Sequence, residues 1–126
     1  MKNHLPLDNV RVIELGTLIA GPFTGRMLGD FGAEVIKIEP PDKADPMRNW
    51  GQQKDGLGLQ WPIQSRNKKS ITLNLREPKG QEIFKQLVKD ADIIIIENFR
   101  PGTMERWGLG YETLKDINPG IIMVRT

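Results

Sequence analysis

Short apolar runs, separated by helix patterns and turn residues, predict that strands and helices alternate along the first part of the chain. The run Val10–Leu15 is rich in β-branched residues and predicts a buried strand. A helix is expected from Pro22 to about Phe31, because proline suits the first turn of a helix and Gly32 suits a left-handed cap. Glu34–Glu39 predicts a second strand. Together they form a βαβ unit, in which the strands are parallel and the crossover is right-handed.

The same alternation returns after a long interruption. Residues 40–69 have no sustained hydrophobic period, and a loop of this length inside a compact domain is usually functional or mobile. The later elements are expected at Ser70–Leu75 (strand), Pro78–Lys89 (helix), Ile93–Ile96 (strand), Met104–Trp107 and Tyr111–Ile117 (short helices) and Ile121–Val124 (strand). The four isoleucines indicate a strand buried on both faces of a sheet. The whole pattern predicts an α/β fold with a mostly parallel sheet.

Length and composition restrict the class of protein. A chain of 126 residues is long enough for one domain and too short for two separate cores. Its 18 Lys and Arg nearly balance its 16 Asp and Glu, which argues against a protein that binds nucleic acid or a membrane surface. Cysteine is absent, so the chain has no disulfide and no thiolate nucleophile.

Targeting and metal signals are also missing from the sequence. The first residues lack the apolar segment of a signal peptide, and the longest apolar run is far too short to span a membrane. His, Asp and Glu residues show no metal-ligand spacing. We therefore expect a cytoplasmic protein without a metal site.

Three local features have both a chemical and a structural interpretation. The turn between Gly16 and Pro22 could hold an anion at a helix N-terminus, or it could be a plain strand-to-helix turn. It lacks the glycine pattern of a dinucleotide fingerprint and the lysine of a P-loop. Glu39 could bind a ribose, although a solvated strand end is the favoured interpretation. The basic group Arg66, Lys68 and Lys69 could meet a phosphate or lie in a solvated loop.

The stretch from Glu97 to Gly102 is the most informative part of the sequence. It follows a buried strand, so its polar groups should emerge at the carboxyl edge of the sheet, where α/β folds bind ligands. Asn98 can donate and accept hydrogen bonds, and Phe99 offers a flat apolar face. Arg100 and Arg106 can bind phosphate oxygens in bidentate fashion. This combination favours a ligand site over an ordinary turn.

Several motifs, in order along nearly the whole chain, resemble the family III CoA-transferases. This family, also called CaiB/BaiF, contains the formyl-CoA and carnitine CoA-transferase relatives. The matching motifs are Gly21–Phe23, Leu28–Glu39, Asp45–Arg48, Asn67–Leu75, Ala91–Asp92, Glu97–Tyr111, Leu114 and Asn118–Pro119. Their number and order make the resemblance far more specific than a single glycine turn.

The resemblance implies a fold and an activity. Family members build a Rossmann-like large domain from an N-terminal and a C-terminal stretch, and two chains interlock as a homodimer. Residues 1–126 would form the N-terminal part of that domain, so the Rossmann-like sheet would be incomplete. Members move CoA from an acyl-CoA ester to a carboxylic acid acceptor through an aspartyl anhydride and an aspartyl-CoA thioester. Coenzyme A is a substrate, and no prosthetic group is implied.

The resemblance also assigns site residues. The CoA-binding positions that it implies here are Ile19, Ala20, Leu73, Asn74, Leu75, Arg76, Asn98, Phe99, Arg100 and Arg106. The family's catalytic aspartate would lie beyond Thr126, so no residue of the chain is assigned as nucleophile, and the chain alone is expected to be inactive and marginally folded. Two alternatives stay open: a dinucleotide-binding domain of an oxidoreductase, and a non-catalytic remnant that binds CoA.

Overall fold

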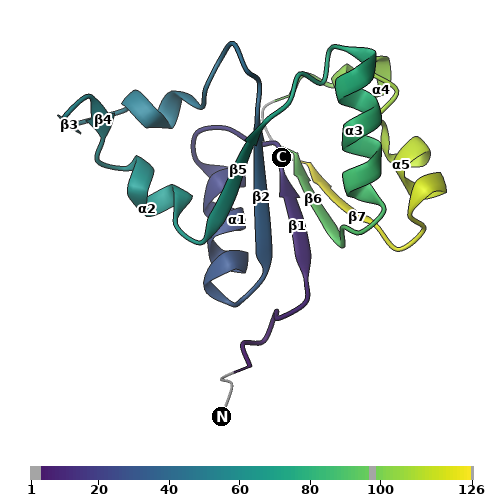
Figure 1. Cartoon of the computed structure of the whole chain (residues 1–126), viewed down its shortest axis with the longest axis horizontal. Coiled ribbons are helices and arrows are strands. Elements are labelled where there is room, and N and C mark those ends of the chain that lie inside the picture. The colour runs from purple at the N-terminus through teal and green to yellow at the C-terminus, as the bar shows by residue number, and fades with distance from the viewer. Residues whose placement is uncertain (1–3, 97–98, 126) are drawn as a thin grey trace.

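The sheet at the centre of the molecule has five strands, all parallel, in the order β5-β2-β1-β6-β7 (Figure 1). The computed structural model describes residues 4–96 and 99–125. The strands are β1 (Arg11–Glu14), β2 (Glu34–Glu39), β5 (Lys68–Thr72), β6 (Ile93–Ile96) and β7 (Ile122–Arg125). Each neighbouring pair is parallel, so the carboxyl ends of all five strands meet at one edge.

Helices cover both faces of this sheet. Helix α1 (Ala20–Asp30) crosses one face between β1 and β2, whereas α3, α4 and α5 lie on the other side (Figure 1). The bounds of these three are Pro78–Val88, Thr103–Arg106 and Tyr111–Ile117. Side chains alternate across the pleat, so Ile13 and Ile94 belong to one core cluster and Val12 and Ile95 to the other. The structure is thus a three-layer α/β fold, as the sequence pattern predicts.

The expected strand Ser70–Leu75 is wrong in its position. Strand β5 begins at Lys68 and ends at Thr72. The backbone N–H of Leu73 donates the last bond to Glu39, and the chain then leaves the sheet. Leu73–Leu75 keep the alternation of a strand because their side chains face a core and a pocket rather than two faces of a sheet.

The other expected elements are confirmed with small shifts at their ends. The bounds of β2, β6 and α5 agree with the sequence analysis, whereas α1 begins two residues before Pro22. Residues 40–69 are not wholly irregular, because they contain elements that are too short to show a hydrophobic period. These are a 3₁₀ helix η1 (Pro46–Asn49), a hairpin of β3 (Gln53–Lys54) and β4 (Leu57–Gly58), and α2 (Trp61–Ser65).

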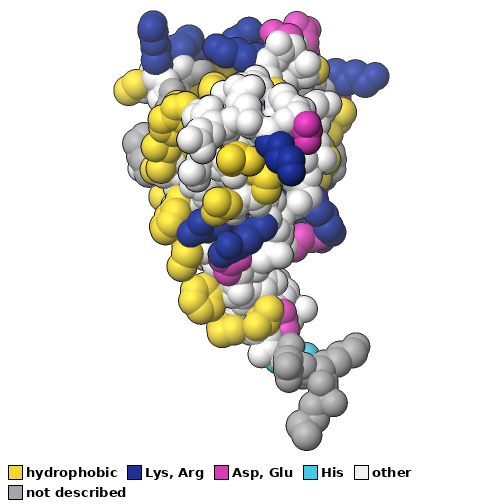
Figure 2. All heavy atoms as spheres, turned by 90° about the vertical axis from the view of Figure 1, so that its left-hand side faces the viewer, with side chains coloured by type: hydrophobic (Ala, Val, Ile, Leu, Met, Phe, Trp, Pro, Cys, Tyr) yellow, Lys and Arg dark blue, Asp and Glu magenta, His cyan; other side chains and the backbone are white. Residues whose placement is uncertain are grey.

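Several large apolar side chains lie on the surface. Ile19, Phe23, Met27 and Phe31 follow one another at four-residue intervals along the exposed side of α1. Ile122 on the edge strand β7 is more than half exposed. Hydrophobic side chains also gather beside Lys and Arg on the face shown in Figure 2. Among the described residues, no helix is both long and apolar enough to cross a membrane.

Candidate functional site

A pocket of about 260 Å³ opens at the carboxyl edge of the parallel sheet. Its walls come from four segments that are distant in sequence: the ends of β1 and β2, the chain after β5, and the chain after β6. The lining residues are Leu15, Thr17, Ile38, Pro40, Lys43, Ala44, Pro46, Leu73, Asn74, Leu75, Arg76, Phe99 and Trp107. This edge is where α/β folds bind their ligands, because the loops after the strands converge there.

The pocket combines apolar walls with a few polar groups. Phe99 and Trp107 meet edge to face, with ring centroids 5.6 Å apart and an interplanar angle of 74°. Lys43, Asn74 and Arg76 supply two cations and one amide. No carboxylate occurs among the lining residues that the structure describes. Such a lining suits an anionic ligand with long apolar parts.

The wall Leu73–Arg76 is fixed from two sides. The Asn74 side chain accepts a hydrogen bond from the backbone N–H of Arg76 at 3.1 Å, which closes a tight turn. Behind it, a Cβ added at Gly80 in α3 would lie only 1.9 Å from the Asn74 carbonyl oxygen. Glycine at this position therefore lets α3 approach the backbone of the wall.

The structure brings together half of the positions that the sequence assigns to the site. Leu73, Asn74, Leu75, Arg76 and Phe99 line the pocket. Asn98 lies outside the described residues. The remaining four positions, Ile19, Ala20, Arg100 and Arg106, are exposed and do not line it.

These four positions belong to different segments: Ile19 and Ala20 lie at the start of α1, whereas Arg100 and Arg106 follow β6. The Arg106 guanidinium donates a hydrogen bond of 2.9 Å to the hydroxyl of Thr103, a residue of the same helix α4. Ile19 is the N-cap of α1 and Ala20 its first residue, and only Leu18 separates them from the pocket residue Thr17.

The wall formed by the chain after β2 is not among the site positions that the sequence predicts. Pro40, Lys43, Ala44 and Pro46 all line the pocket, yet they fall in the stretch with no hydrophobic period. Their position directly after a predicted parallel strand was the available signal, because such loops gather at one edge.

Each cation of the basic group Arg66, Lys68 and Lys69 forms an ion pair with a carboxylate of the chain. Arg66 pairs with Asp30, and Lys69 pairs with Glu34. The ammonium of Lys68 is buried, where it lies 2.7 Å from Glu14 Oε2 and donates to the Pro22 carbonyl at 2.6 Å. Burial lowers the pKa of Lys68, and the nearby Glu14 carboxylate opposes this effect. All three cations are therefore matched by carboxylates of the chain itself.

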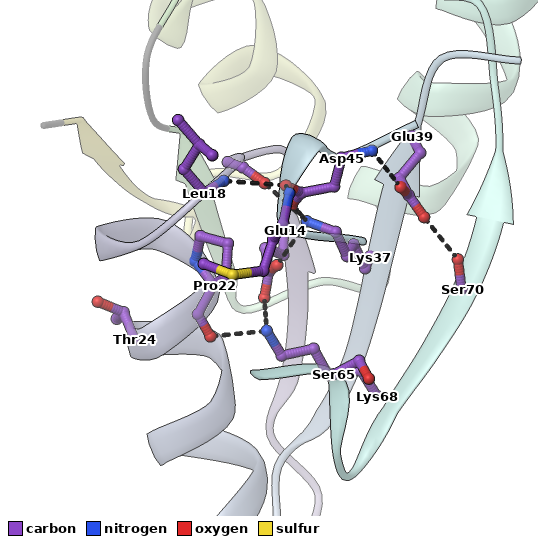
Figure 3. A network of polar contacts seen from close by, with 12 residues as sticks. Glu14, Leu18, Pro22, Thr24, Lys37, Glu39, Asp45, Ser65, Lys68 and Ser70 are labelled. Atoms are coloured by element: carbon purple, nitrogen blue, oxygen red, sulfur yellow. Dashed lines mark hydrogen bonds and ion pairs between the residues drawn. The ribbon is translucent and has the colours of Figure 1, made fainter. Parts of the chain in front are cut away.

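Four buried charges alternate in sign beneath the first turn of α1 (Figure 3). In order they are Lys68, Glu14, Lys37 and Asp45, and each neighbouring pair is in contact. The Lys37 ammonium lies 3.0 Å from Glu14 Oε1, 2.8 Å from Asp45 Oδ2 and 2.8 Å from the Gly16 carbonyl oxygen. Two cations and two anions leave the cluster neutral, which burial requires.

Glu39 corrects both interpretations that the sequence offered for it. The residue is buried, so it is not a solvated strand end, and its oxygens are occupied, so it is not available to a ribose. It accepts hydrogen bonds from Arg48, from the backbone N–H of Asp45 and from the Ser70 hydroxyl. Burial alone would raise the pKa of Glu39, but the bonds from Arg48 and Asp45 outweigh it and lower the pKa to about 2.

A comparison with models of protein families shows which family the chain belongs to. It matches the model of CoA-transferase family III over residues 7–126. The chain belongs to CoA-transferase family III. This confirms the resemblance on which the sequence analysis relied, and it separates the chain from the oxidoreductases that the dinucleotide alternative invoked.

Named relatives support the same family. The chain is 60% identical over 121 residues to a succinyl-CoA–D-citramalate CoA-transferase of Chloroflexus aurantiacus, covering 95% of this chain and 30% of the relative. It is 43% identical over 123 residues to a human succinyl-CoA:glutarate CoA-transferase, covering 97% of this chain and 28% of the relative. The chain thus spans about a third of the length of the curated relatives it matches.

Solved structures of similar proteins have the same arrangement. A CaiB/BaiF family protein from Brucella suis superposes with a TM-score of 0.88 at 38% identity, over 98% of this chain and 33% of that one. A hypothetical protein (Rv3272) from Mycobacterium tuberculosis superposes with a TM-score of 0.86 at 38% identity, over 96% and 33%. The matched third of each of these structures therefore has the same α/β arrangement around a parallel sheet as this chain.

Proposed function

We propose that this chain supplies the CoA-binding part of an enzyme that moves CoA from an acyl-CoA ester to a carboxylic acid. The observation that carries the proposal is the pocket at the carboxyl edge of the sheet. It gathers Leu73–Arg76 and Phe99, and these are positions that the family resemblance assigns to CoA. The resemblance adds Ile19, Ala20, Asn98, Arg100 and Arg106 to the same site.

The two kinds of lining fit the two parts of CoA. Apolar surface from Leu73, Leu75 and the Phe99–Trp107 pair suits the adenine ring and the pantetheine arm. Lys43 and Arg76 suit the phosphates, because charge-assisted hydrogen bonds to phosphate oxygens are the stronger ones. CoA is then a substrate of the enzyme, and no prosthetic group enters the proposal.

The nucleophile is assigned to an aspartate outside the described residues. Among the described residues, the pocket lining contains no carboxylate, and the buried carboxylates nearby, Glu39 and Asp45, are held by cations and backbone N–H groups. In the proposed reaction the aspartate attacks the thioester carbonyl, and the CoA thiolate leaves. The mixed anhydride has one carbonyl carbon from the aspartate and one from the donor acid. The thiolate then attacks the carbon that belongs to the aspartate, which releases the donor acid and leaves an aspartyl-CoA thioester. The acceptor carboxylate repeats these two steps in reverse.

The named relatives narrow the substrates that we propose. Several relatives are named for transfer from succinyl-CoA, to citramalate, malate or glutarate. We therefore propose succinyl-CoA as donor and a dicarboxylic acid as acceptor.

We also propose that the protein acts in the cytoplasm as an interlocked homodimer. The exposed apolar side chains along α1, Ile19, Phe23, Met27 and Phe31, are then covered in the assembled enzyme.

Calorimetric titration of the 126-residue chain with CoA, and separately with NAD, tests this function. We expect saturable binding of CoA only. Arg76→Ala and Arg106→Ala should each weaken it by about tenfold, the value of one lost charge-assisted bond. Arg66→Ala is the matched control, because Arg66 pairs with Asp30 away from the pocket. Binding of NAD without CoA would contradict the proposed function. CoA transfer by the isolated chain would contradict the assignment of the nucleophile to an outside residue.

A further inference from the structure

We propose that Asp45 is a positioning residue of the CoA pocket, which locks the turn after β1 to the loop after β2. The inference rests on the proposed function and deepens it. Asp45 is the first residue of the family motif Asp45–Arg48. Its neighbours Ala44 and Pro46 line the pocket, but Asp45 does not, so contact with the ligand does not explain an aspartate at this position.

The Asp45 carboxylate joins three groups at once. Its Oδ1 atom accepts the backbone N–H of Leu18 at 3.1 Å and that of Met47 at 2.9 Å. Its Oδ2 atom lies 2.8 Å from the Lys37 ammonium. Asp45 is 1% exposed, so its Oδ1 atom is satisfied by two backbone N–H groups, whereas Oδ2 has the ion pair with Lys37 and no hydrogen bond. The side chain reaches from the loop after β2 to the turn after β1 (Figure 3).

The turn that Asp45 holds has an unfavourable backbone. Leu18 has a φ of 64°, a left-handed conformation that costs a leucine free energy and that needs support from its surroundings. Two bonds supply that support: Asp45 holds the Leu18 N–H, and Lys37 holds the Gly16 carbonyl. Thr17, which lies between them, lines the pocket, and Ile19 and Ala20 follow.

The same carboxylate also organises the opposite segment. Asp45 caps the 3₁₀ helix η1 through the Met47 N–H, and its own N–H donates to Glu39 Oε1 at 2.7 Å. Ala44 and Pro46, its neighbours in sequence, are pocket wall. One buried side chain therefore fixes the relative position of two walls that come from different strands. Such a residue acts on the ligand only through these walls.

A matched pair of double variants separates the lock from the buried charge. Lys37→Met with Asp45→Asn and Lys37→Met with Asp45→Ala both remove one buried cation and one buried anion, so both keep the cluster neutral. Only asparagine keeps an oxygen that can accept the Leu18 N–H. We expect the alanine form to bind CoA at least about tenfold more weakly than the asparagine form. Val35→Ala, a core change in β2 away from the pocket, controls for lost stability and should leave CoA affinity unchanged.

Hydrogen exchange at the Leu18 amide reports the lock without any ligand. We expect fast exchange of this amide in the alanine form, slow exchange in the asparagine form, and slow exchange in Val35→Ala. Equal exchange or equal CoA affinity in the two double variants would overturn the proposal. If the unmodified chain bound no CoA while the exchange difference persisted, the proposed function would fail, and the ligand named here would fail with it.

Discussion

The carboxylate of Glu39 and the guanidinium of Arg48 form a two-pronged ion pair, with Nε–Oε1 at 3.1 Å and Nη2–Oε2 at 2.6 Å. The guanidinium also lies 3.9 Å from the centre of the Trp61 ring. Arg48 therefore connects the end of β2 to α2, and it does so through a planar group that makes two parallel bonds and a stacked contact.

Removing that guanidinium should destabilise the fold strongly. Arg48→Met leaves the buried Glu39 carboxylate without its cation, and we expect a loss of about 3 kcal/mol or more in the free energy of unfolding. Arg48→Lys keeps the charge but loses the second bond and the stacking, for a loss of about 1–2 kcal/mol. Urea unfolding measures both changes. Arg11→Met is the control, because the pair Arg11–Glu34 is partly exposed and should contribute less than about 1 kcal/mol.

Stability should fall in acid as Glu39 becomes protonated. Its pKa is about 2 in the folded chain, against 4.5 for the free side chain. The folded state thus binds its proton more weakly than the unfolded state, and the stabilisation is fully present above pH 4.5. It is lost as pH falls from 4.5 to 2 and amounts to about 3 kcal/mol. Urea unfolding between pH 2 and 7 measures the slope, and Glu39→Gln should flatten it. An unchanged slope in that variant would contradict the assignment to Glu39.

A methyl group at Gly25 should disturb the buried charges. An added Cβ there would lie 2.0 Å from Glu14 Oε2, an atom that is itself in contact with Lys68. Because helix and carboxylate cannot both keep their places, we expect Gly25→Ala to lower the free energy of unfolding by about 2 kcal/mol or more. Gly120→Ala is the control, since its nearest neighbour would be at an ordinary 3.6 Å. Similar midpoints of urea unfolding for the two variants would refute the close approach.

Glycine should be tolerated at Leu18 better than at a half-buried leucine of α1. Leu18 has a left-handed backbone, which glycine adopts without steric cost, so the relieved strain offsets part of the lost side chain. We expect Leu18→Gly to change stability by less than about 1 kcal/mol. Leu28→Gly lies inside a helix and should cost about 2 kcal/mol or more. Thermal unfolding compares them, and an equal loss in both would argue against strain at Leu18.

Much of the fold could be predicted because apolar periodicity reports burial directly. Strand β2 was predicted with its observed bounds, since its side chains alternate between two packed faces. Leu73–Leu75 carry the same alternation outside the sheet, and a pattern of period two does not distinguish a strand from a pocket wall. The family resemblance supplied Leu73–Arg76 and Phe99 of the site. The loop after β2 has no periodicity and was missed.

The buried charges were visible in the sequence but not interpreted. Glu14 interrupts one apolar strand and Lys37 another, and the two are directly paired in the register of the parallel sheet. A charged residue within each of two neighbouring buried strands is a signal for an internal ion pair. Asp45 carries no such signal, because only the folded loop brings it to Lys37.

The two neighbours of β1, which lies at the centre of the sheet, come from distant parts of the chain. Val12 pairs with Val35 on one side and with Ile93 on the other, so the first neighbour is synthesised long before the second. All four ions of the cluster Lys68, Glu14, Lys37 and Asp45 are present once Lys68 has been made. Strands β1, β2 and β5 can therefore pair during synthesis. The other edge of β1 stays unpaired until β6, the isoleucine strand, has been made.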